Sequence, residues 1–526
     1  MVLKAIVSVH KFGADLPLFR SAVSGVLQPE RGSIIFRHAT ALTVALTAAF
    51  LSAPADPTHE LNTSPLAAIV LIFVLGCWIL LYAWVYYNSW LIWLAWKLRA
   101  NAPTRPPLPA SLPRVTVQLP VYNEEAVVAR LVEAVGRLDW PADRLEIQLL
   151  DDSTDRTPEI AAQVLERLRE HGLTVSHLRR AVREGYKAGA LRDALTASTG
   201  ELILILDADF VPEPPLLRQL VPWFSDPRVA MVQARWGHLA PARTLIERSA
   251  GFWIDRHFEI EQLARSRSGQ FFHFNGSGGV WRRTAIDDAG GWSADTLAED
   301  LDLSFRAWKR GWKFVFDYDA IVPAEIPATV AALRVQQGRW SRGAFQMARK
   351  AIPQLAASTW RDRLTVSLQL TGYTFPILML ALALTSGASA WARTYHPSLG
   401  LLAVDVPMIG FFFGLAAQMG VQIFRSGLRR GWLEVEASAV GIGMAPLLMK
   451  DGVAGLRSYG GVFKRTPKST RAAGQTTAIV LVEAALGALC LGNAAWAIAL
   501  GTPWIALLPL MAGSGLLVFA WRTVWP

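Results

Sequence analysis

The stretch "LILILDADF", residues 202–210, decides the fold class. Five apolar residues run directly into two aspartates at alternate positions, Asp207 and Asp209, and such a short apolar run next to turn residues predicts a buried strand. Similar runs lie at 115–119, 145–150 and 230–234, with apolar residues at helical spacing over 124–138 and 158–171 between them. This alternation predicts an α/β domain with a mostly parallel sheet covered by helices.

The composition indicates an integral membrane protein. Of 526 residues, 52% are hydrophobic and 18% charged, against about 25% charged residues in a typical globular chain. The net charge of +10 does not indicate nucleic acid, because Lys and Arg beside apolar runs are typical of cytoplasmic loops. Both cysteines, Cys77 and Cys490, fall inside apolar runs. We interpret them as buried hydrophobic residues and not as a disulfide or metal site.

Six apolar runs approach the length of about 20 residues that a bilayer requires, at 34–53, 65–94, 364–389, 401–424, 476–500 and 504–521. A seventh run, 440–449, is too short, and we interpret it as interfacial. Basic residues precede the first run, whereas the loop after it has none, so the N-terminus is predicted to be cytoplasmic. With six spans, the segments 97–363, 425–430 and 450–471 share that side.

Three regions are therefore expected. Residues 1–97 carry two transmembrane helices, residues 98–350 form a cytoplasmic α/β domain, and residues 351–526 hold interfacial helices, a cytoplasmic loop and about four transmembrane helices. The expected location is the inner or plasma membrane, with the lipid bilayer as a partner.

Acidic residues follow two of the predicted strands, at the edge where α/β sheets bind ligands. Asp151 and Asp152 follow 145–150, although Asp152 or Asp155 could instead serve to cap the next helix. Asp207 and Asp209 are followed by "VPEPP" and not by a helix. Hard carboxylate oxygens in this arrangement suit Mg²⁺ or Mn²⁺, whose shell substrate phosphates complete. The pair therefore predicts a nucleotide-diphosphate substrate.

Two further motifs add a cation and a base. In "REGYKAGAL", Lys187 lies in a glycine-containing turn before a helix, where a cation and free backbone N–H groups can hold phosphate, although a solvated lysine is equally compatible. In "LAEDLDLS", Glu299 and Asp300 begin an amphipathic helix. A carboxylate at this place could be a cap or a general base.

The segment "QQGRW", residues 336–340, places Gln336, Arg339 and Trp340 on one helical face. Arg339 can bind a phosphate, and Trp340 can stack on a sugar. The same residues could form an interfacial helix anchored in lipid headgroups.

Taken in order, these motifs resemble those of processive, membrane-embedded family 2 glycosyltransferases, and most of all the cellulose synthase-like A and C group of plant mannan and glucan synthases. The similarity is carried by "LDDSTD", "GYKAGAL", "DADFVPEP", "VQARW", "FNGSGGVWR", "EDLDL" and "QQGRW". It implies a GT-A fold and an inverting hexosyltransferase. That enzyme would polymerise a β-linked glucan or mannan from a nucleotide sugar, UDP-glucose or GDP-mannose, and pass the growing polysaccharide through its own channel.

The resemblance also implies roles for residues. Asp300 would be the catalytic base, and Glu299 and Trp340 would contact the acceptor. Nucleotide and donor binding would fall to Asp151, Asp152, Lys187, Asp207, Gln336 and Arg339, and the metal to Asp207 and Asp209. The segment "FKRTPKS", residues 463–469, is similar to the gating loop of cellulose synthases through Phe463, Thr466 and Lys468, although it could be a plain basic loop.

The sequence departs from the family pattern at two places, with "AED" where cellulose synthases have "TED" and with Gly338 inside the QxxRW motif. Two alternatives stay open. One is a non-processive enzyme that adds a single sugar to a lipid, similar to ceramide glucosyltransferases. The other is a sugar-binding membrane scaffold or transporter. Donor sugar, linkage and export partners are not determined by the sequence.

Overall fold

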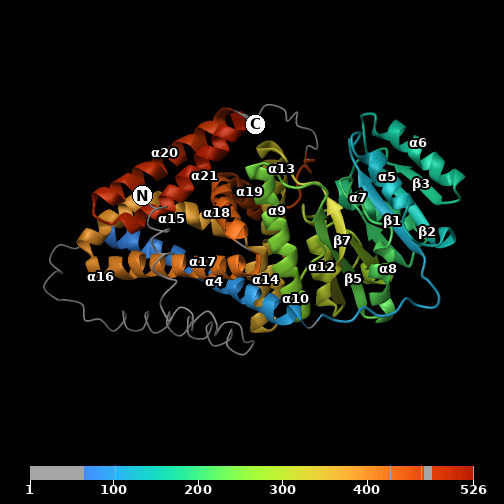
Figure 1. Ribbon diagram of the computed structural model, residues 1–526, viewed down its shortest axis with the longest axis horizontal. Coiled ribbons are helices and arrows are strands. Elements are labelled where there is room, and N and C mark those ends of the chain that lie inside the picture. Colours follow the sequence, from blue (N-terminus) through green and yellow to red (C-terminus); the bar gives the residue numbers. More distant parts are fainter. Residues whose placement is uncertain (1–63, 101, 427, 464, 467–476, 525–526) are drawn as a thin grey trace. The chain divides into compact units, whose positions relative to one another are not determined.

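The computed structural model describes residues 64–100, 102–426, 428–463, 465–466 and 477–524 (Figure 1). Its α/β domain is built on a seven-stranded sheet with the order β3-β2-β1-β4-β6-β5-β7. The strands are β1 (Val115–Val121), β2 (Leu145–Asp151), β3 (Thr174–Arg179), β4 (Leu202–Ile205), β5 (Val229–His238), β6 (Gly279–Arg282) and β7 (Lys313–Ala324).

The sheet is mostly parallel, as predicted. Neighbours from β3 to β4 run parallel, as do β5 and β7, whereas β6 runs antiparallel to both of its neighbours. All four predicted strands are present, and β3, β6 and β7 are additional. The pattern of β3 is hidden because its side chains are only partly buried, and β6 has only four residues.

Helices cover both faces of the sheet. One apolar core packs α5 (Val128–Gly136) and α6 (Thr157–Glu170) against β1, β2 and β4. The core on the opposite face contains α7 (Tyr186–Ala197), α10 (Leu263–Arg267), α11 (Arg283–Asp288) and α12 (Glu299–Lys309), together with the second half of α4 (Pro65–Arg99). Smaller elements on the domain are α8 (Leu216–Leu220), α9 (Leu245–Arg256), a π-helix (His257–Gln262), and 3₁₀ turns at Ala142–Arg144 and Val221–Ser225.

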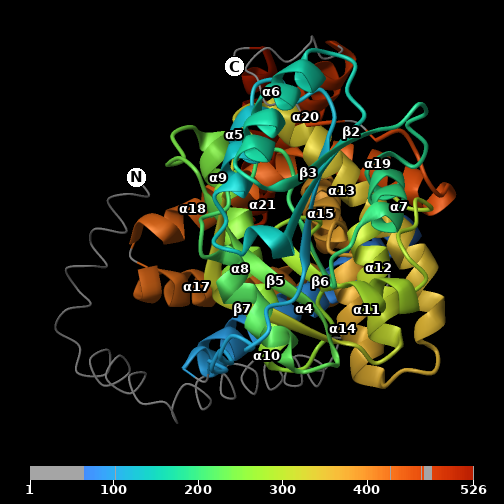
Figure 2. The same ribbon diagram turned by 90° about the vertical axis from the view of Figure 1, so that its right-hand side faces the viewer.

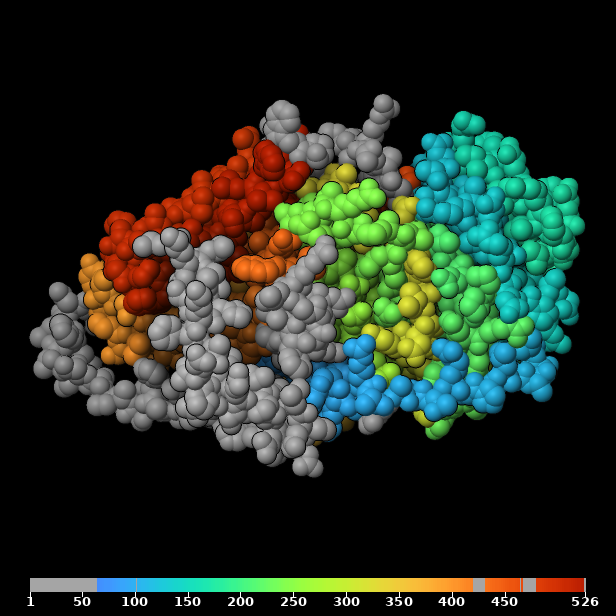
Figure 3. Space-filling view, in the orientation of Figure 1, coloured from blue at the N-terminus to red at the C-terminus, as the bar shows by residue number. Residues whose placement is uncertain are grey.

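The helix α4 reaches from an apolar span into the α/β domain. Its 35 residues correspond to about 52 Å at 1.5 Å per residue, well beyond the ~30 Å hydrocarbon core of a bilayer. Tyr87 and Leu91 belong to the same core as α7 and α11. After α4, the proline-rich segment lies along the domain (Figure 3), where Arg105 binds the buried Asp317 through two hydrogen bonds of 3.0 and 3.1 Å.

Five helices in the described residues are long and apolar enough to cross a membrane: Pro65–Arg99, Thr374–Tyr395, Pro397–Met419, Ile479–Ala499 and Pro503–Val524. The first predicted run, 34–53, lies outside the described residues. The corresponding elements are α15 (Thr374–Tyr395), α16 (Pro397–Gly400), a π-helix (Leu401–Asp405), α17 (Val406–Ser426), α20 (Thr477–Ala499), a 3₁₀ turn (Pro503–Ala506) and α21 (Leu507–Val524).

The predicted run 364–389 is not one helix. It is divided between α14 (Trp360–Leu370), which follows a 3₁₀ turn (Ile352–Leu355), and α15. Thr371 Oγ1 donates to the Ser367 carbonyl, and the N–H of Thr374 bonds to the Thr371 carbonyl. These bonds close a turn that competes with continued helix, so the boundary near 364 was wrong.

A bent pair of helices, α18 (Leu428–Gly443) and α19 (Ala445–Arg457), could form a sixth span. The bend of 56° falls inside the run 440–449. α18 is tied to α9 by the ion pairs Arg256–Glu434 and Arg248–Glu436, at 3.3 and 3.1 Å. α19 packs along α13 (Val330–Ala351), where the Ser341 hydroxyl donates to the Leu448 carbonyl. The pair therefore contacts the α/β domain along both of its halves.

Candidate active site

Acidic residues meet at one edge of the sheet. β1, β2 and β4 are parallel neighbours, so their carboxyl ends lie together, and these ends lead into Glu124, Asp151 and Asp207 respectively. The start of α12 reaches the same place, because Glu299 lies close to Lys187 of α7. Figure 2 shows α7 beside α12. The structure thus brings together motifs that lie far apart in the sequence.

Lys187 is the centre of this acidic group. Its Nζ lies 2.6 Å from Asp207 Oδ1, 2.9 Å from the Gly276 carbonyl oxygen and 3.9 Å from Glu299 Oε1. Burial alone would lower the pKa of Lys187, but the carboxylates of Asp207 and Glu299 hold it above its ordinary value. Lys187 is therefore a fixed cation that can neutralise either these carboxylates or a bound phosphate.

Asp300 has the electrostatic properties of a general base. Burial raises the pKa of its carboxyl to about 7, and the neighbouring Glu299 carboxylate adds to the rise, while Lys187 and Arg339 act in the opposite direction. Asp300 Oδ1 accepts a hydrogen bond of 2.8 Å from the N–H of Leu301. A carboxylate that gains a proton near neutral pH can take one from a hydroxyl.

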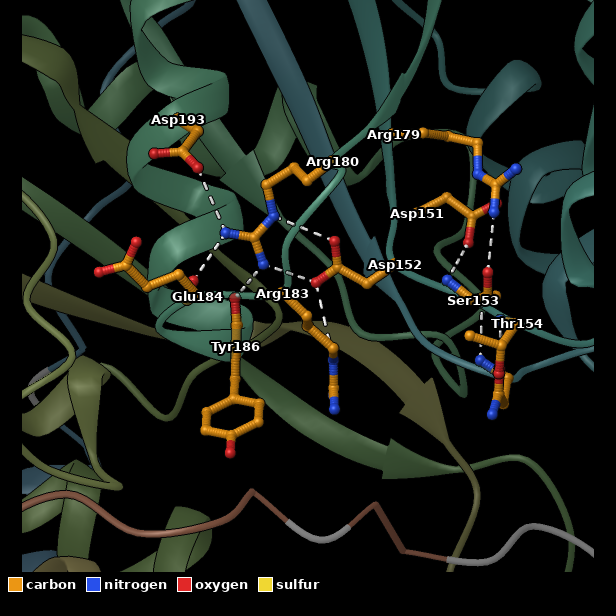
Figure 4. A network of polar contacts seen from close by, with 11 residues as sticks. Asp151, Asp152, Ser153, Thr154, Arg179, Arg180, Arg183, Glu184, Tyr186 and Asp193 are labelled. Atoms are coloured by element: carbon orange, nitrogen blue, oxygen red, sulfur yellow. Dashed lines mark hydrogen bonds and ion pairs between the residues drawn. The ribbon is translucent and has the colours of Figure 1, made fainter.

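Asp151 and Asp152 follow β2 but have different surroundings (Figure 4). Asp151 is buried, and its two oxygens bond to the N–H of Ser153 at 2.8 Å and to His177 Nε2 at 2.9 Å. Although burial alone would raise the pKa of Asp151, these bonds hold it below its ordinary value. The predicted contact of Asp151 with a nucleotide stays a prediction, and the observed bonds indicate that it also shapes the turn after β2.

Asp152 faces a cluster of arginines that sequence reasoning missed. Arg180 binds its carboxylate with both Nε and Nη2, at 3.0 and 2.6 Å, and Arg183 Nε lies 3.7 Å away. The Arg183 guanidinium lies 3.5 Å from the Tyr122 ring centre and 4.9 Å from that of Tyr186. Aromatic rings and guanidinium planes of this kind can stack with a planar base. The only local signal was the spacing of these residues in "RRAVREGY".

The helix α13 carries the QxxRW residues. The Arg339 guanidinium lies 4.3 Å from the centre of the Phe463 ring, and its charge affects Asp300. Gln336 and Trp340 lie on the same helix, and both are half-buried. A Cβ at Gly338 would clash with Asp451 of α19. The departure at Gly338 therefore has a packing reason, since α19 approaches α13 closely at this residue.

A cavity of about 250 Å³ opens beside these groups. Its lining includes Tyr186 and Lys187 from the start of α7, Thr296 and Glu299 around the start of α12, and Phe463. Phe463 and Thr466 are thus described, and Phe463 lies at the cavity. Lys468 lies outside the described residues.

Asp207 and Asp209 offer carboxylate oxygens of the kind that a divalent metal takes, and their role as its ligands stays a prediction. Among the described residues, no group of three or more His, Cys, Asp or Glu side chains could hold a metal alone. Mg²⁺ sites that share the ion with substrate phosphates usually take one or two carboxylates from the protein. The Asp207 side chain, 35% exposed, is open to such a ligand.

Comparison with known proteins shows what this domain is similar to. Residues 113–343 match the family described as "Glycosyltransferase like family 2". Glucomannan 4-beta-mannosyltransferase 2 of Arabidopsis thaliana is 42% identical over 251 residues, which cover 47% of this chain and 47% of that protein. Glucomannan 4-beta-mannosyltransferase 7 of the same plant is 36% identical over 318 residues, or 56% and 57% of the two chains. The chain spans about half the length of these relatives.

Among solved structures, the mannosyltransferase PcManGT of Pyrobaculum calidifontis in complex with GDP-Man and Mn²⁺ aligns with 73% of this chain and 99% of its own, at 22% identity and a TM-score of 0.48.

Residues 113–343 therefore resemble the family 2 glycosyltransferases, and their mostly parallel sheet covered by helices is the α/β fold that the sequence predicted. Over about half of its length, the chain is similar to the glucomannan 4-beta-mannosyltransferases. The resemblance found in the motifs is thereby confirmed. The roles of the individual site residues stay predictions.

Proposed function

We propose that this protein is a processive, inverting glycosyltransferase that builds a β-linked mannan-type polysaccharide from GDP-mannose. The observation that carries the proposal is the meeting of Lys187, Asp207 and Asp300 at one end of the sheet, with Arg339 of α13 close by. The names of the relatives support mannose as the transferred sugar.

The proposed reaction is a single displacement at the anomeric carbon of the donor. Asp300 accepts the proton of the attacking acceptor hydroxyl, the new bond forms from that oxygen to the anomeric carbon, and the bond from that carbon to the diphosphate breaks. Lys187 and Arg339 place positive charge where the diphosphate leaves. Mg²⁺ or Mn²⁺, held by Asp207 and Asp209, would neutralise part of that charge when bound.

Tyr122, Arg183 and Tyr186 would hold the base of the nucleotide. Their rings and guanidinium offer a planar surface, and Asp152 fixes Arg183 from the side. Glu299 and Trp340 are proposed to face the acceptor sugar, Glu299 from the start of α12 and Trp340 from α13.

The membrane-length helices support the proposal that the product is a polymer that leaves through the protein. Five membrane-length helices accompany the domain, and Phe463, just before α20, lies at the donor cavity. If the α18–α19 pair lies at the membrane surface, the segment before α20 and the domain share one side, which we propose is cytoplasmic. The bilayer and the growing polysaccharide would then be partners.

The test is an assay of the detergent-purified protein with radiolabelled GDP-mannose or UDP-glucose, in Mg²⁺ or Mn²⁺. Products are separated into lipid-extractable and high-molecular-weight fractions. The proposal expects long chains from GDP-mannose that an endo-β-mannanase digests. Label only in the lipid fraction would instead indicate a single-sugar transferase, and chains from UDP-glucose alone would indicate a glucan synthase. No nucleotide release from either donor would favour a binding scaffold.

A further inference from the structure

The segment before α20 crosses the α/β domain as a strap, defined here as residues 458–463 with Arg465 and Thr466. The backbone of its first part is fixed by hydrogen bonds. Gln346 Nε2 of α13 donates to the carbonyls of Ser458 and Gly460, at 3.0 and 2.6 Å, and the N–H of Gly460 donates to the Asp295 carbonyl at 2.6 Å.

The middle of the strap touches the proposed catalytic groups. The Phe463 ring stacks with Tyr186, with ring centres 6.2 Å apart and planes inclined by 29°. The Arg339 guanidinium also approaches the Phe463 ring. Tyr186 has a positive φ of 51° and Gly185 before it a φ of 67°, which is costly for a tyrosine. The Tyr186 ring thus stacks on Phe463 from a backbone position that is strained.

Beyond Phe463, the strap is tied to the opposite side of the site by an ion pair. Arg465 Nε and Nη2 donate to Glu124 Oε1 and Oε2, at 2.9 and 2.8 Å. The Glu124 side chain is only 8% exposed. Such a paired, bidentate guanidinium–carboxylate contact is strong and fixes direction.

Glu124 is itself held in place by the turns after β1 and β2. Its N–H donates to Thr157 Oγ1 at 2.8 Å. Asn123, with a positive φ of 56°, donates its N–H to Ser153 Oγ, and its side-chain oxygen accepts from the N–H of Thr154, both at 2.8 Å. Arg465 therefore binds a carboxylate that belongs to the rigid edge of the sheet.

We propose that Arg465 is a positioning residue for the transfer, which acts through Glu124 to hold Phe463 over the donor cavity and so lengthens the stay of the bound nucleotide sugar. This inference rests on the proposed function of the site. Replacing either partner breaks the bidentate contact to the largely buried Glu124 carboxylate, an effect that falls mainly on dissociation rates. Glu124 and Arg465 are 341 residues apart in the chain, so the pair connects the first strand of the domain to the segment before α20.

The test measures dissociation of a fluorescent GDP analogue from the full-length, detergent-purified protein in Mn²⁺, by stopped flow. Arg465→Glu and Glu124→Arg are each expected to speed dissociation about 5- to 30-fold, the factor that one to two kcal/mol represents. The exchanged pair, Glu124→Arg with Arg465→Glu, is expected to recover most of the loss. The matched control is Arg218→Glu, which breaks the exposed ion pair of Arg218 with Asp139 away from the strap, and wild-type rates are expected for it.

A second readout separates positioning from folding. KM for GDP-mannose is expected to rise in the single variants more than kcat falls, with melting temperatures near that of the control. Wild-type dissociation rates in both single variants would overturn the proposal, and so would an exchanged pair that shows no recovery. If the wild-type protein binds neither GDP nor UDP analogues, the proposed function fails and this proposal fails with it.

Discussion

The Asp300 carboxylate lies against Gly276, so that a Cβ added to Gly276 would stand 2.9 Å from Asp300 Oδ2. The carbonyl of the same glycine accepts the hydrogen bond from Lys187 Nζ. One backbone position, with a φ of +82°, thus sets the separation of the proposed base from the proposed phosphate-binding cation.

Gly276→Ala is therefore expected to reduce the transfer rate strongly. The added methyl group displaces Asp300, and a displacement near 1 Å can cost about 10²-fold in rate. The control is Gly172→Ala, because Gly172 has the same φ of +82° but open space around the added Cβ. Both variants carry similar backbone strain, so melting temperatures should fall alike. Equal activity in the two variants would contradict the placement of Asp300.

The pH dependence of the rate should reflect Asp300. Because the base must be unprotonated, kcat/KM for the donor is expected to fall as the pH drops through about 7, the pKa of Asp300. Glu299→Gln removes a negative charge that raises this pKa, so the acidic limb should move to lower pH. A limb that stays in place in Glu299→Gln would show that another group titrates.

A buried ion pair joins α13 to α20. Arg334 and Glu483, 3% and 0% exposed, are bonded to each other, and the Arg334 guanidinium lies 4.9 Å from the Phe519 ring centre. Replacing only Arg334 by Met should destabilise the fold by about 3–5 kcal/mol, because Glu483 is left charged and buried. The double change, with Glu483→Leu, should restore most of the stability. Thermal unfolding of Arg334→Met, Glu483→Leu and the double variant in detergent measures this, and additive losses would contradict it.

The close approach of α13 and α19 predicts sensitivity at Gly338. Gly338→Ala forces the Asp451 carboxylate on α19 to move and disturbs its contact with the helix that carries Arg339, so activity should fall a few-fold, well below the ~10²-fold loss of a 1 Å misplacement. Combining it with Asp451→Ala removes the clashing carboxylate and should recover part of the activity. A fully active Gly338→Ala enzyme would contradict this prediction, because it would show that α19 can move away from α13 without loss of function.

The predictable part of the fold consists of features that are local in sequence. The runs at β1, β2, β4 and β5 are buried and apolar, so their periodicity was visible. The common location of their carboxyl ends could also be predicted, because the carboxyl ends of parallel neighbours lie at one edge of the sheet. The antiparallel β6, the helix break at Thr371 and the partly exposed β3 lacked such patterns.

The candidate site was predictable only where its residues belong to local motifs, such as those at the carboxyl ends of the predicted strands. Lys187, Asp207 and Glu299 meet as the motifs suggested. The contacts of Arg183 with Tyr122 and Tyr186 were not visible in the sequence, because the position of Tyr186 depends on the left-handed backbone at Gly185 and Tyr186. The pairing of Arg465 with Glu124 could not be predicted either, because no local pattern relates residues that are so far apart in the chain.

The most direct test of the central claim is the turnover of Asp300→Asn with saturating GDP-mannose and Mn²⁺, measured beside its affinity for GDP. The account predicts that the rate falls by about 10²- to 10⁴-fold, the usual loss for a general base, while GDP binds as in the wild-type protein. An Asp300→Asn protein that transfers mannose at the wild-type rate would contradict it.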